Sequence, residues 1–135
     1  MFMKLPVCFL LVIACFISCQ DKADYEKAED AQDAGREFIR ASLDGNYDKA
    51  LFYLYKDPSN TNIRLLDKWK KDYNKRSQED KVGFKDANII AIRIDPVSDS
   101  VVNYVYTNTF EVKDTTTIKV INVNGEWLVD LKDIH

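Results

Sequence analysis

The chain has 135 residues and a formal net charge of −3, with 46% hydrophobic and 30% charged residues. This length allows one domain, and the composition is that of an ordinary folded protein, neither disordered nor membrane-spanning throughout. The mildly acidic balance argues against nucleic-acid binding, which usually needs a concentrated basic face, so we expect no nucleic-acid partner.

The first 18 residues have the pattern of a bacterial signal peptide. Lys4 supplies a positive charge before an apolar run over residues 5–17, which is short for a membrane span. Polar residues begin directly after Cys19. The sequence therefore predicts cleavage before Cys19 and a signal peptide over residues 1–18.

The end of this segment carries a resemblance of its own. Phe16-Ile17-Ser18-Cys19 resembles the bacterial lipobox, in which the cysteine receives diacylglycerol and becomes the new amino terminus. The resemblance implies lipidation of Cys19 and firm membrane anchoring, because two or more acyl chains bind a bilayer stably. Cleavage before Cys15 and an uncleaved anchor helix remain as alternatives. We expect a lipid-anchored protein of the cell envelope.

An acidic segment follows Cys19. Residues 20–33 contain six acidic residues and two lysines, and we predict a lipidated tether over residues 19–30 and the folded domain over residues 31–135. The start Cys-Gln-Asp-Lys-Ala-Asp resembles the export tag of Bacteroidota lipoproteins displayed on the outer face, which implies outer-membrane attachment and surface exposure. A plain solvated tether is the alternative.

The first half of the domain has helical periodicity. Apolar residues recur at helical spacing over residues 23–43, 47–55 and 61–75, which predicts three helices. Gly45 stands where a left-handed helix cap is expected. Lysines and Arg76 cover one side of the third helix, either as a solvated face or as a contact for anionic head groups. Residues 77–81 are interpreted as a polar link.

The second half of the domain has a period of two. Strands are predicted around residues 90–94, 102–110, 118–122 and 126–131, with a turn over residues 95–99. Asn124-Gly125 is the strongest hairpin signal in the chain. We therefore predict an α+β fold in which three N-terminal helices pack in a curved antiparallel sheet of about four strands, forming a cone.

Two segments resemble one superfamily of small domains. They are Phe38-Ile39 … Leu43-Asp44-Gly45-Asn46-Tyr47-Asp48-Lys49-Ala50, and Val123-Asn124-Gly125-Glu126-Trp127-Leu128-Val129. This layout is similar to the nuclear transport factor 2-like, or cystatin-like, superfamily, and in particular to lipid-anchored Bacteroidota proteins of unknown function. The resemblance implies the cone-shaped cystatin-like fold.

Several chemistries are excluded by the residues that are absent. Cys8, Cys15 and Cys19 are the only cysteines, and His135 is the only histidine. The domain therefore lacks the residues for Cys–His or Ser–His–Asp catalysis and for the usual zinc and copper sites. The four glycines form no phosphate loop. We expect no cofactor, no metal and no catalytic residue.

One enzymatic alternative comes from the superfamily resemblance, because ketosteroid isomerase-like members use a pocket Asp with Tyr donors. The candidates here would be Asp95, Asp130, Tyr104 and Tyr106. The sequence favours a structural interpretation, with Asp95 in a turn and Asp130 facing solvent between two apolar neighbours. A calcium site is a weaker alternative, because its candidate ligands lack regular spacing; these are Asp57, Asp67, Asp72, Glu79 and Asp80.

The aromatic residues are the remaining candidates for a binding site. Most are expected in the core, but some could line an apolar pocket at the open end of the cone. The candidate lining residues are Phe38, Phe52, Trp69, Tyr73, Tyr104, Tyr106 and Trp127. We expect a non-enzymatic binding or interaction domain whose partner is an envelope protein or a small apolar ligand. The first alternative is a carrier of small apolar ligands in the cone cavity, and the second is a ketosteroid isomerase-like lyase or isomerase.

Overall fold

The computed structural model describes residues 24–132, so the predicted signal peptide, Cys19 and His135 lie outside the described residues. The elements are, in order, α1 (Ala31–Asp44), α2 (Tyr47–Phe52), α3 (Thr61–Asn74), α4 (Gln78–Asp86), β1 (Ile89–Ser98), β2 (Val101–Asn108), β3 (Thr116–Val123) and β4 (Glu126–Asp130). The strands form one antiparallel sheet in the order β1-β2-β3-β4. The predicted α+β class with a curved four-stranded antiparallel sheet is confirmed, and a fourth helix is added.

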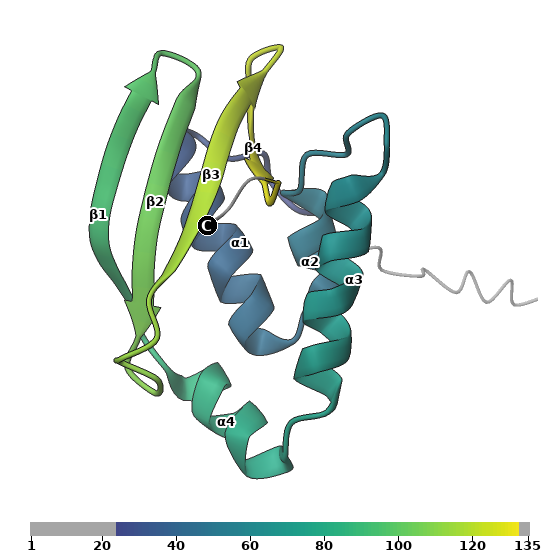
Figure 1. The fold of residues 1–135 in the computed structure, drawn as a ribbon, viewed down its shortest axis with the longest axis vertical. Helices are drawn as coiled ribbons and strands as arrows, with labels where there is room; N and C mark the ends of the chain where they lie inside the picture. Colours follow the sequence, from purple (N-terminus) through teal and green to yellow (C-terminus); the bar gives the residue numbers. More distant parts are fainter. Residues whose placement is uncertain (1–23, 133–135) are drawn as a thin grey trace, which may run out of the picture.

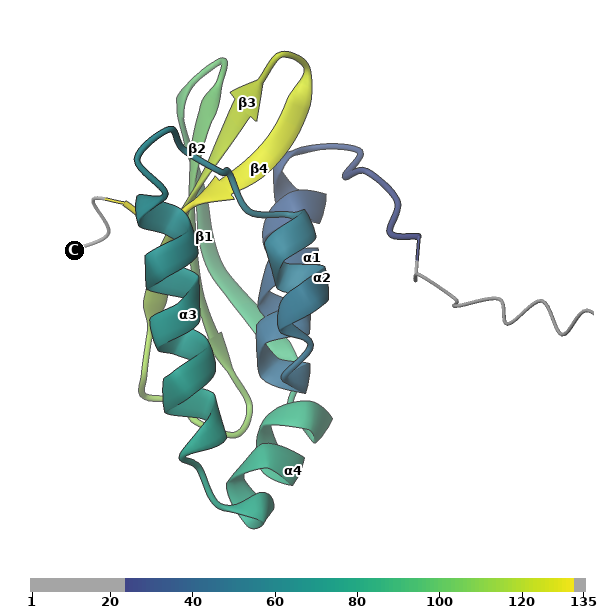
Figure 2. The same ribbon diagram turned by 90° about the vertical axis from the view of Figure 1, so that its right-hand side faces the viewer.

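The sheet and the helices form successive layers (Figure 1). Helix α1 contacts all four strands, and α2 and α3 lie on its far side. Phe38 and Ile39 of α1 are buried against Ile118 and Val120 of β3 and Val129 of β4. Figure 2 shows α4 crossing the end of the molecule beneath α1 and α3. The core thus lies between α1 and the sheet and extends to Ala50 of α2 and Leu66 of α3.

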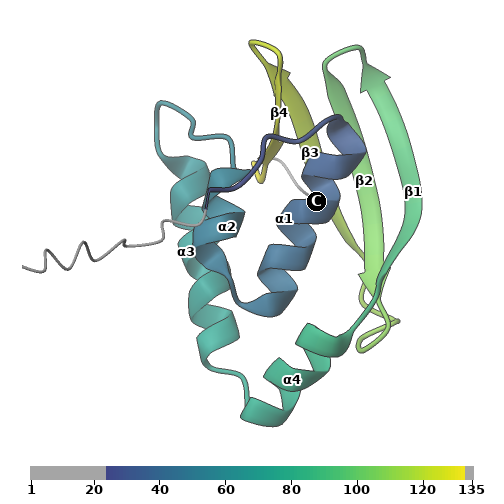
Figure 3. The ribbon, with the colours of Figure 1, turned by 180° about the vertical axis from the view of Figure 1, so that it is seen from behind.

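The first helix starts later than its periodicity suggests. We expected a helix from residue 23, but α1 begins at Ala31, where the Asp30 side chain accepts a hydrogen bond from the Asp33 backbone N–H. An Asp side chain at this position ends the helix on its amino-terminal side, because it satisfies a free N–H group. Residues 24–30 are neither helix nor strand, and they pass beside α2 to the start of α1 (Figure 3).

The fourth helix replaces the polar link expected at residues 77–81. Ser77 caps α4 by accepting from the Asp80 backbone N–H, and Glu79 and Asp80 occupy its first turn. Only Phe84 of this helix is buried. A nine-residue helix with one buried side chain has no apolar stripe, so hydrophobic periodicity could not reveal it.

The strand predictions hold with two corrections. Asn124-Gly125 forms the β3–β4 turn with positive φ at both residues, and Tyr104 and Tyr106 share the buried face of β2, as expected. The turn predicted at residues 95–99 begins too early in the sequence, because β1 continues through Pro96 to Ser98. Proline is tolerated there because β1 is an edge strand with a register shift. Phe110 lies beyond the end of β2.

The second helix is also shorter than expected, and the residues after it join the sheet. Helix α2 ends at Phe52, and Leu54 forms an isolated parallel bridge with Val129. The Val129 N–H donates to the Tyr53 carbonyl, and the Tyr55 N–H donates to the Val129 carbonyl, both at 2.8 Å. This short segment covers the free edge of β4.

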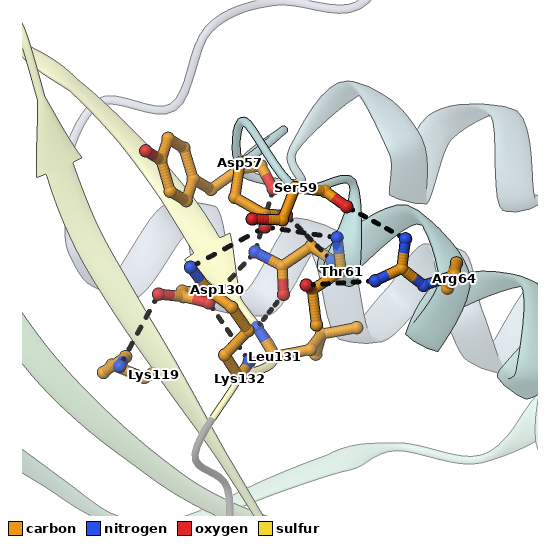
Figure 4. A network of polar contacts seen from close by, with 10 residues as sticks. Asp57, Ser59, Thr61, Arg64, Lys119, Asp130, Leu131 and Lys132 are labelled. Carbon is orange, nitrogen blue, oxygen red and sulfur yellow. Dashed lines mark hydrogen bonds and ion pairs between the residues drawn. The ribbon is translucent and has the colours of Figure 1, made fainter.

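A buried polar network fixes the amino-terminal end of α3 to the end of β4 (Figure 4). We call Asp57, Asn62 and Asp130 the Asn62 network. The Asn62 amide donates to Asp130 at 3.0 Å and to the Tyr55 carbonyl at 2.9 Å, and its oxygen accepts from the Leu131 N–H at 2.9 Å. The expectation that Asp130 faces solvent is therefore wrong: it is only 5% exposed, because β4 ends beneath α3.

Asp57 completes this network from the loop before α3. Its carboxylate accepts from the backbone N–H groups of Asn62 at 2.9 Å and Thr61 at 3.1 Å. These hydrogen bonds, that of Asn62 first, lower the pKa of Asp57. Lys119 lies 3.5 Å from Asp130, and Lys132 lies 3.9 Å from Asp57. Among the described residues, no buried side-chain nitrogen or oxygen lacks a partner.

Candidate binding pocket

A pocket of about 280 Å³ lies at the opposite end of α3 from the Asn62 network. Five aromatic side chains from four elements line it, and we call it the aromatic pocket. They are Tyr47 of α2, Trp69 and Tyr73 of α3, Phe84 of α4 and Tyr106 of β2. The other lining residues are Ser42, Leu43, Asp72, Arg76, Asn108, Glu111, Asp114 and Thr116.

The turn between α1 and α2 brings Tyr73 into the wall. Gly45 caps α1 with φ +73°, a conformation that favours glycine, and Asn46 caps α2 through the Lys49 N–H. A Cβ on Gly45 would lie 2.5 Å from the Tyr73 ring. The Asp44-Gly45-Asn46-Tyr47 segment therefore does two things: it reverses the chain and leaves room for the Tyr73 ring.

Contacts among the aromatic side chains fix the positions of Tyr47 and Trp69 in the pocket wall. The Tyr47 hydroxyl donates to the Trp69 carbonyl at 3.3 Å, and the Tyr47 ring meets the Tyr73 ring edge-on at 5.8 Å. Trp69 packs on buried Phe38 at 5.7 Å. These contacts join the C-terminal half of α3 to the start of α2.

Helix α4 is held in place by α1. The Arg40 guanidinium donates to the carbonyl oxygens of Ala87 at 2.6 Å, Lys85 at 3.0 Å and Phe84 at 3.1 Å. These carbonyls lie at the carboxyl-terminal end of α4, where backbone acceptors lack partners within the helix, and the Phe84 carbonyl also accepts from the Ala87 N–H at 3.2 Å. Phe84 thereby enters the aromatic pocket, where its ring also meets the ring of Phe110 at 4.9 Å.

The loop between β2 and β3 supplies the charged rim. The Asn108 side-chain oxygen accepts from the backbone N–H groups of Phe110 and Glu111, both at 2.9 Å. The Thr107 hydroxyl lies 2.9 to 3.1 Å from three loop carbonyls and donates among them. Glu111 then pairs with Arg76 at 3.3 Å, which joins this loop to the end of α3.

Burial changes the acidity of two phenols in the aromatic pocket. It is the main reason that the pKa of Tyr47 is raised to about 12, and the neighbouring Tyr73 and Asp72 add to this rise. Burial also raises the pKa of Tyr106, and a hydrogen bond with Thr116 opposes this in part. Both phenols are therefore neutral at physiological pH.

The structure places the seven candidate lining residues in two groups. Trp69, Tyr73 and Tyr106 line the aromatic pocket. Phe38 and Tyr104 are fully buried in the core, while Phe52 and Trp127 are half-buried at its edge, so these four lie elsewhere. Sequence reasoning missed Tyr47 and Phe84 as lining residues. Tyr47 had a signal in the Asp-Gly-Asn-Tyr motif, whereas Phe84 lies on the helix that was not predicted.

The residues considered for catalysis or metal binding are not brought together. Asp95 pairs with Arg93 on the exposed edge strand, and Asp130 belongs to the Asn62 network. Of the four catalytic candidates only Tyr106 lines the aromatic pocket, and of the calcium candidates only Asp72 lines it. Within residues 24–132, no group of three His, Cys, Asp or Glu residues is placed to hold a metal ion. None of the helices in this range has the length and apolar character of a membrane span.

Comparisons with known proteins support the fold. No protein-family model and no curated protein matches the sequence. Among solved structures, the chain is similar to an NTF-2 like protein of unknown function from Shewanella oneidensis MR-1, with a TM-score of 0.50 and 16% identity. The match covers 71% of this chain and 88% of that chain. The domain therefore has a nuclear transport factor 2-like fold.

Proposed function

We propose that this chain is a lipid-anchored envelope protein whose domain binds a small ligand in the aromatic pocket without catalysing a reaction. The anchor is the lipid on Cys19, which the lipobox resemblance implies. The aromatic pocket is the observation that carries the binding role. Because of this pocket, binding of a small ligand is favoured over the interaction role that the sequence suggested.

The aromatic pocket supports ligand binding because it is apolar inside and charged only at its rim. Tyr106 is buried, and Trp69, Tyr73 and Tyr47 are half-buried, whereas Asp72 and Asp114 are exposed. Ligand sites in proteins typically combine an aromatic interior with a few polar groups, and they start at about 300 Å³. A pocket of about 280 Å³ fits a compact molecule, such as one with a single ring.

The arrangement of carboxylates supports a non-enzymatic role. A proton abstraction of the ketosteroid isomerase kind needs a carboxylate and a phenol facing one substrate. Here Tyr106 lines the aromatic pocket, but Asp95 and Asp130 lie elsewhere. The pocket's own carboxylates are on its rim, and Glu111 is paired with Arg76.

Fluorescence of Trp69 gives the test of ligand binding. A Trp127→Phe background leaves Trp69 as the only tryptophan in the chain, and a set of small ring compounds is titrated against the full chain in a non-ionic detergent. We expect members of the set to change Trp69 emission. Ser42→Phe should abolish the change by filling the aromatic pocket, whereas Ser59→Phe, at the other end of α3, should not. Binding that survives Ser42→Phe, or no binding at all, would overturn the proposal.

Labelling with a palmitate analogue gives the test of the anchor. We expect the full chain to incorporate the label and to sediment with membranes, Cys19→Ala to lose both properties, and Cys15→Ala to keep both. If only Cys15→Ala lost the label, the modified cysteine would be Cys15 and not Cys19. A Cys19→Ala protein that still sediments with membranes would contradict anchoring by lipid.

An interaction role is a second candidate, favoured by exposed apolar residues near the aromatic pocket. Val82 of α4 is 49% exposed, and Phe110 and Val112 of the β2–β3 loop are 42% and 57% exposed. Phe110 packs directly on Phe84. A photo-crosslinking residue at Val112 in living cells should give a discrete protein adduct if this surface binds a partner, and the same residue at Asp99 should not.

A further inference from the structure

The rim of the aromatic pocket carries an excess of negative charge. Three carboxylates, Asp72, Glu111 and Asp114, face one guanidinium, that of Arg76, which leaves a formal charge of −2. Arg76 pairs with Glu111. Among the described residues, neither Asp72 nor Asp114 forms an ion pair with another side chain, so both remain available to a cation.

The rings of the aromatic pocket already attract cations from the protein itself. The Arg76 guanidinium lies over the Phe84 ring, 4.4 Å from its centre, and the Lys81 ammonium lies 5.4 Å from the centre of the Tyr73 ring. Such contacts arise because the face of an aromatic ring is electron-rich. Tyr47, Trp69 and Tyr106 supply further rings of the same kind, and tryptophan is the strongest of them.

The same electrostatics acts on the phenols inside. Burial is the largest cause of the raised pKa of Tyr47; the charge of Arg76 lowers this pKa and the charge of Asp72 raises it, so charges of both signs on the rim act on the interior. Because Tyr47 and Tyr106 stay neutral, the interior offers no charge of its own. An anionic ligand would meet the repulsion of Asp72 and Asp114, and Arg76, the only basic residue among those that line the pocket, is already paired with Glu111.

From the aromatic walls and the acidic rim, we infer that the ligand of the aromatic pocket is a small organic cation, an amine or quaternary ammonium joined to a compact apolar group. This inference rests on the proposed ligand-binding function and names its ligand class. The cation would lie against the rings, with Asp72 and Asp114 balancing its charge. Recognition of ammonium groups by aromatic side chains is an established use of such walls.

Three probes of similar size test the charge. They are benzyltrimethylammonium, its uncharged isostere neopentylbenzene, and the anion phenylacetate, each titrated against the full chain carrying Trp127→Phe. We expect the cation to bind at least about tenfold more tightly than the isostere, which is the scale of a desolvated cation–π contact. Phenylacetate should bind most weakly.

Two variants with the same change in net charge assign the effect to the rim. Asp72→Asn should weaken binding of the cation about three- to fivefold, as expected for a partly exposed charge, and should leave the isostere unchanged. Asp99→Asn, in the β1–β2 turn at the far end of the sheet, should change neither. Higher salt should weaken only the cation.

The outcomes separate this inference from the proposed function. If the isostere or the anion binds as tightly as the cation, and Ser42→Phe abolishes that binding, the aromatic pocket binds ligands but the inference is overturned. If Asp72→Asn and Asp99→Asn weaken the cation equally, the rim does not act and the inference is overturned. If none of the probes binds, the inference fails, while the proposed function fails only if the wider set of ring compounds also fails to bind.

Discussion

The two ends of α3 differ in how their polar groups are used. At the amino-terminal end, Asp57, Asn62 and Asp130 are buried and bonded to one another or to nearby backbone groups. At the carboxyl-terminal end, Asp72 and Arg76 border a pocket that remains partly open. One end is a closed polar network and the other borders an open pocket.

This difference separates stability from binding along a single helix. A buried network in which every group is satisfied fixes one arrangement and makes any deletion costly. Exposed charges on a rim contribute little to folding, so they can serve a ligand. We therefore expect variants at the amino-terminal end of α3 to affect stability most and variants at the other end to affect binding most.

The largest effect is expected for Asn62→Ala. The substitution removes three hydrogen bonds and leaves the Leu131 N–H, the Tyr55 carbonyl and the Asp130 carboxylate without this partner. Loss of a buried partner of this kind should lower the free energy of unfolding by about 3 kcal/mol. Urea denaturation followed by circular dichroism measures this value.

Asn74→Ala is the matched control at the other end of α3, where Asn74 is exposed. It should change the free energy of unfolding by less than about 0.5 kcal/mol. Equal effects of the two substitutions would contradict the difference between the ends of the helix. A small effect of Asn62→Ala would mean that water replaces its hydrogen bonds.

The next largest loss of stability is expected for Gly45→Ala, with Gly125→Ala as its matched control. Both glycines have positive φ, +73° and +85°, so each substitution should cost about 1–2 kcal/mol from backbone strain. Only at Gly45 does the new Cβ meet a side chain, the Tyr73 ring at 2.5 Å; at Gly125 there is no atom within 4 Å. Gly45→Ala should therefore be the more destabilising of the two and should also weaken ligand binding. If both variants lost the same stability and Gly45→Ala bound ligand as before, the Tyr73 ring would be able to move away from the new Cβ at no cost, which contradicts this prediction.

The last effect is confined to alkaline solution and is absent at neutral pH. Because folding raises the pKa of Tyr47 to about 12, the neutral phenol contributes stability that is complete below about pH 10, the unfolded value, and is lost as the pH rises to about 12. Tyr47→Phe should remove this dependence on pH. The slope of unfolding free energy against pH between these values should thus be shallower in the variant, and identical slopes would contradict the assignment.

The fold could be predicted from sequence where one local signal was enough. The Asn124-Gly125 turn and the buried face of β2 follow from glycine conformation and from a period of two, both readable within a few residues. Helix α4 was missed because Phe84 alone anchors it. The start of α1 was misplaced because residues before Asp30 continue the helical spacing of apolar residues without being helical.

The Asn62 network and the candidate site were less predictable because both depend on contacts between distant residues. The Asn62 amide reaches Asp130 across 68 positions, and alternation along β4 alone suggested that Asp130 faced solvent. Aromatic composition identified Trp69, Tyr73 and Tyr106, but it could not separate them from Phe38 and Tyr104, which have the same chemistry and lie in the core. The pocket is defined by which rings the packing leaves uncovered.

The first described residues pack against the folded domain. The Tyr53 hydroxyl donates to the Glu26 carbonyl at 2.6 Å, and the Tyr25 ring packs on Phe52 at 5.6 Å. Only five peptide steps separate Asp24 from Cys19, a reach of at most about 18 Å even when fully extended. If Cys19 carries the proposed lipid, this short connection keeps the domain close to the membrane surface. The proposed ligand would then bind in the layer of water next to the head groups.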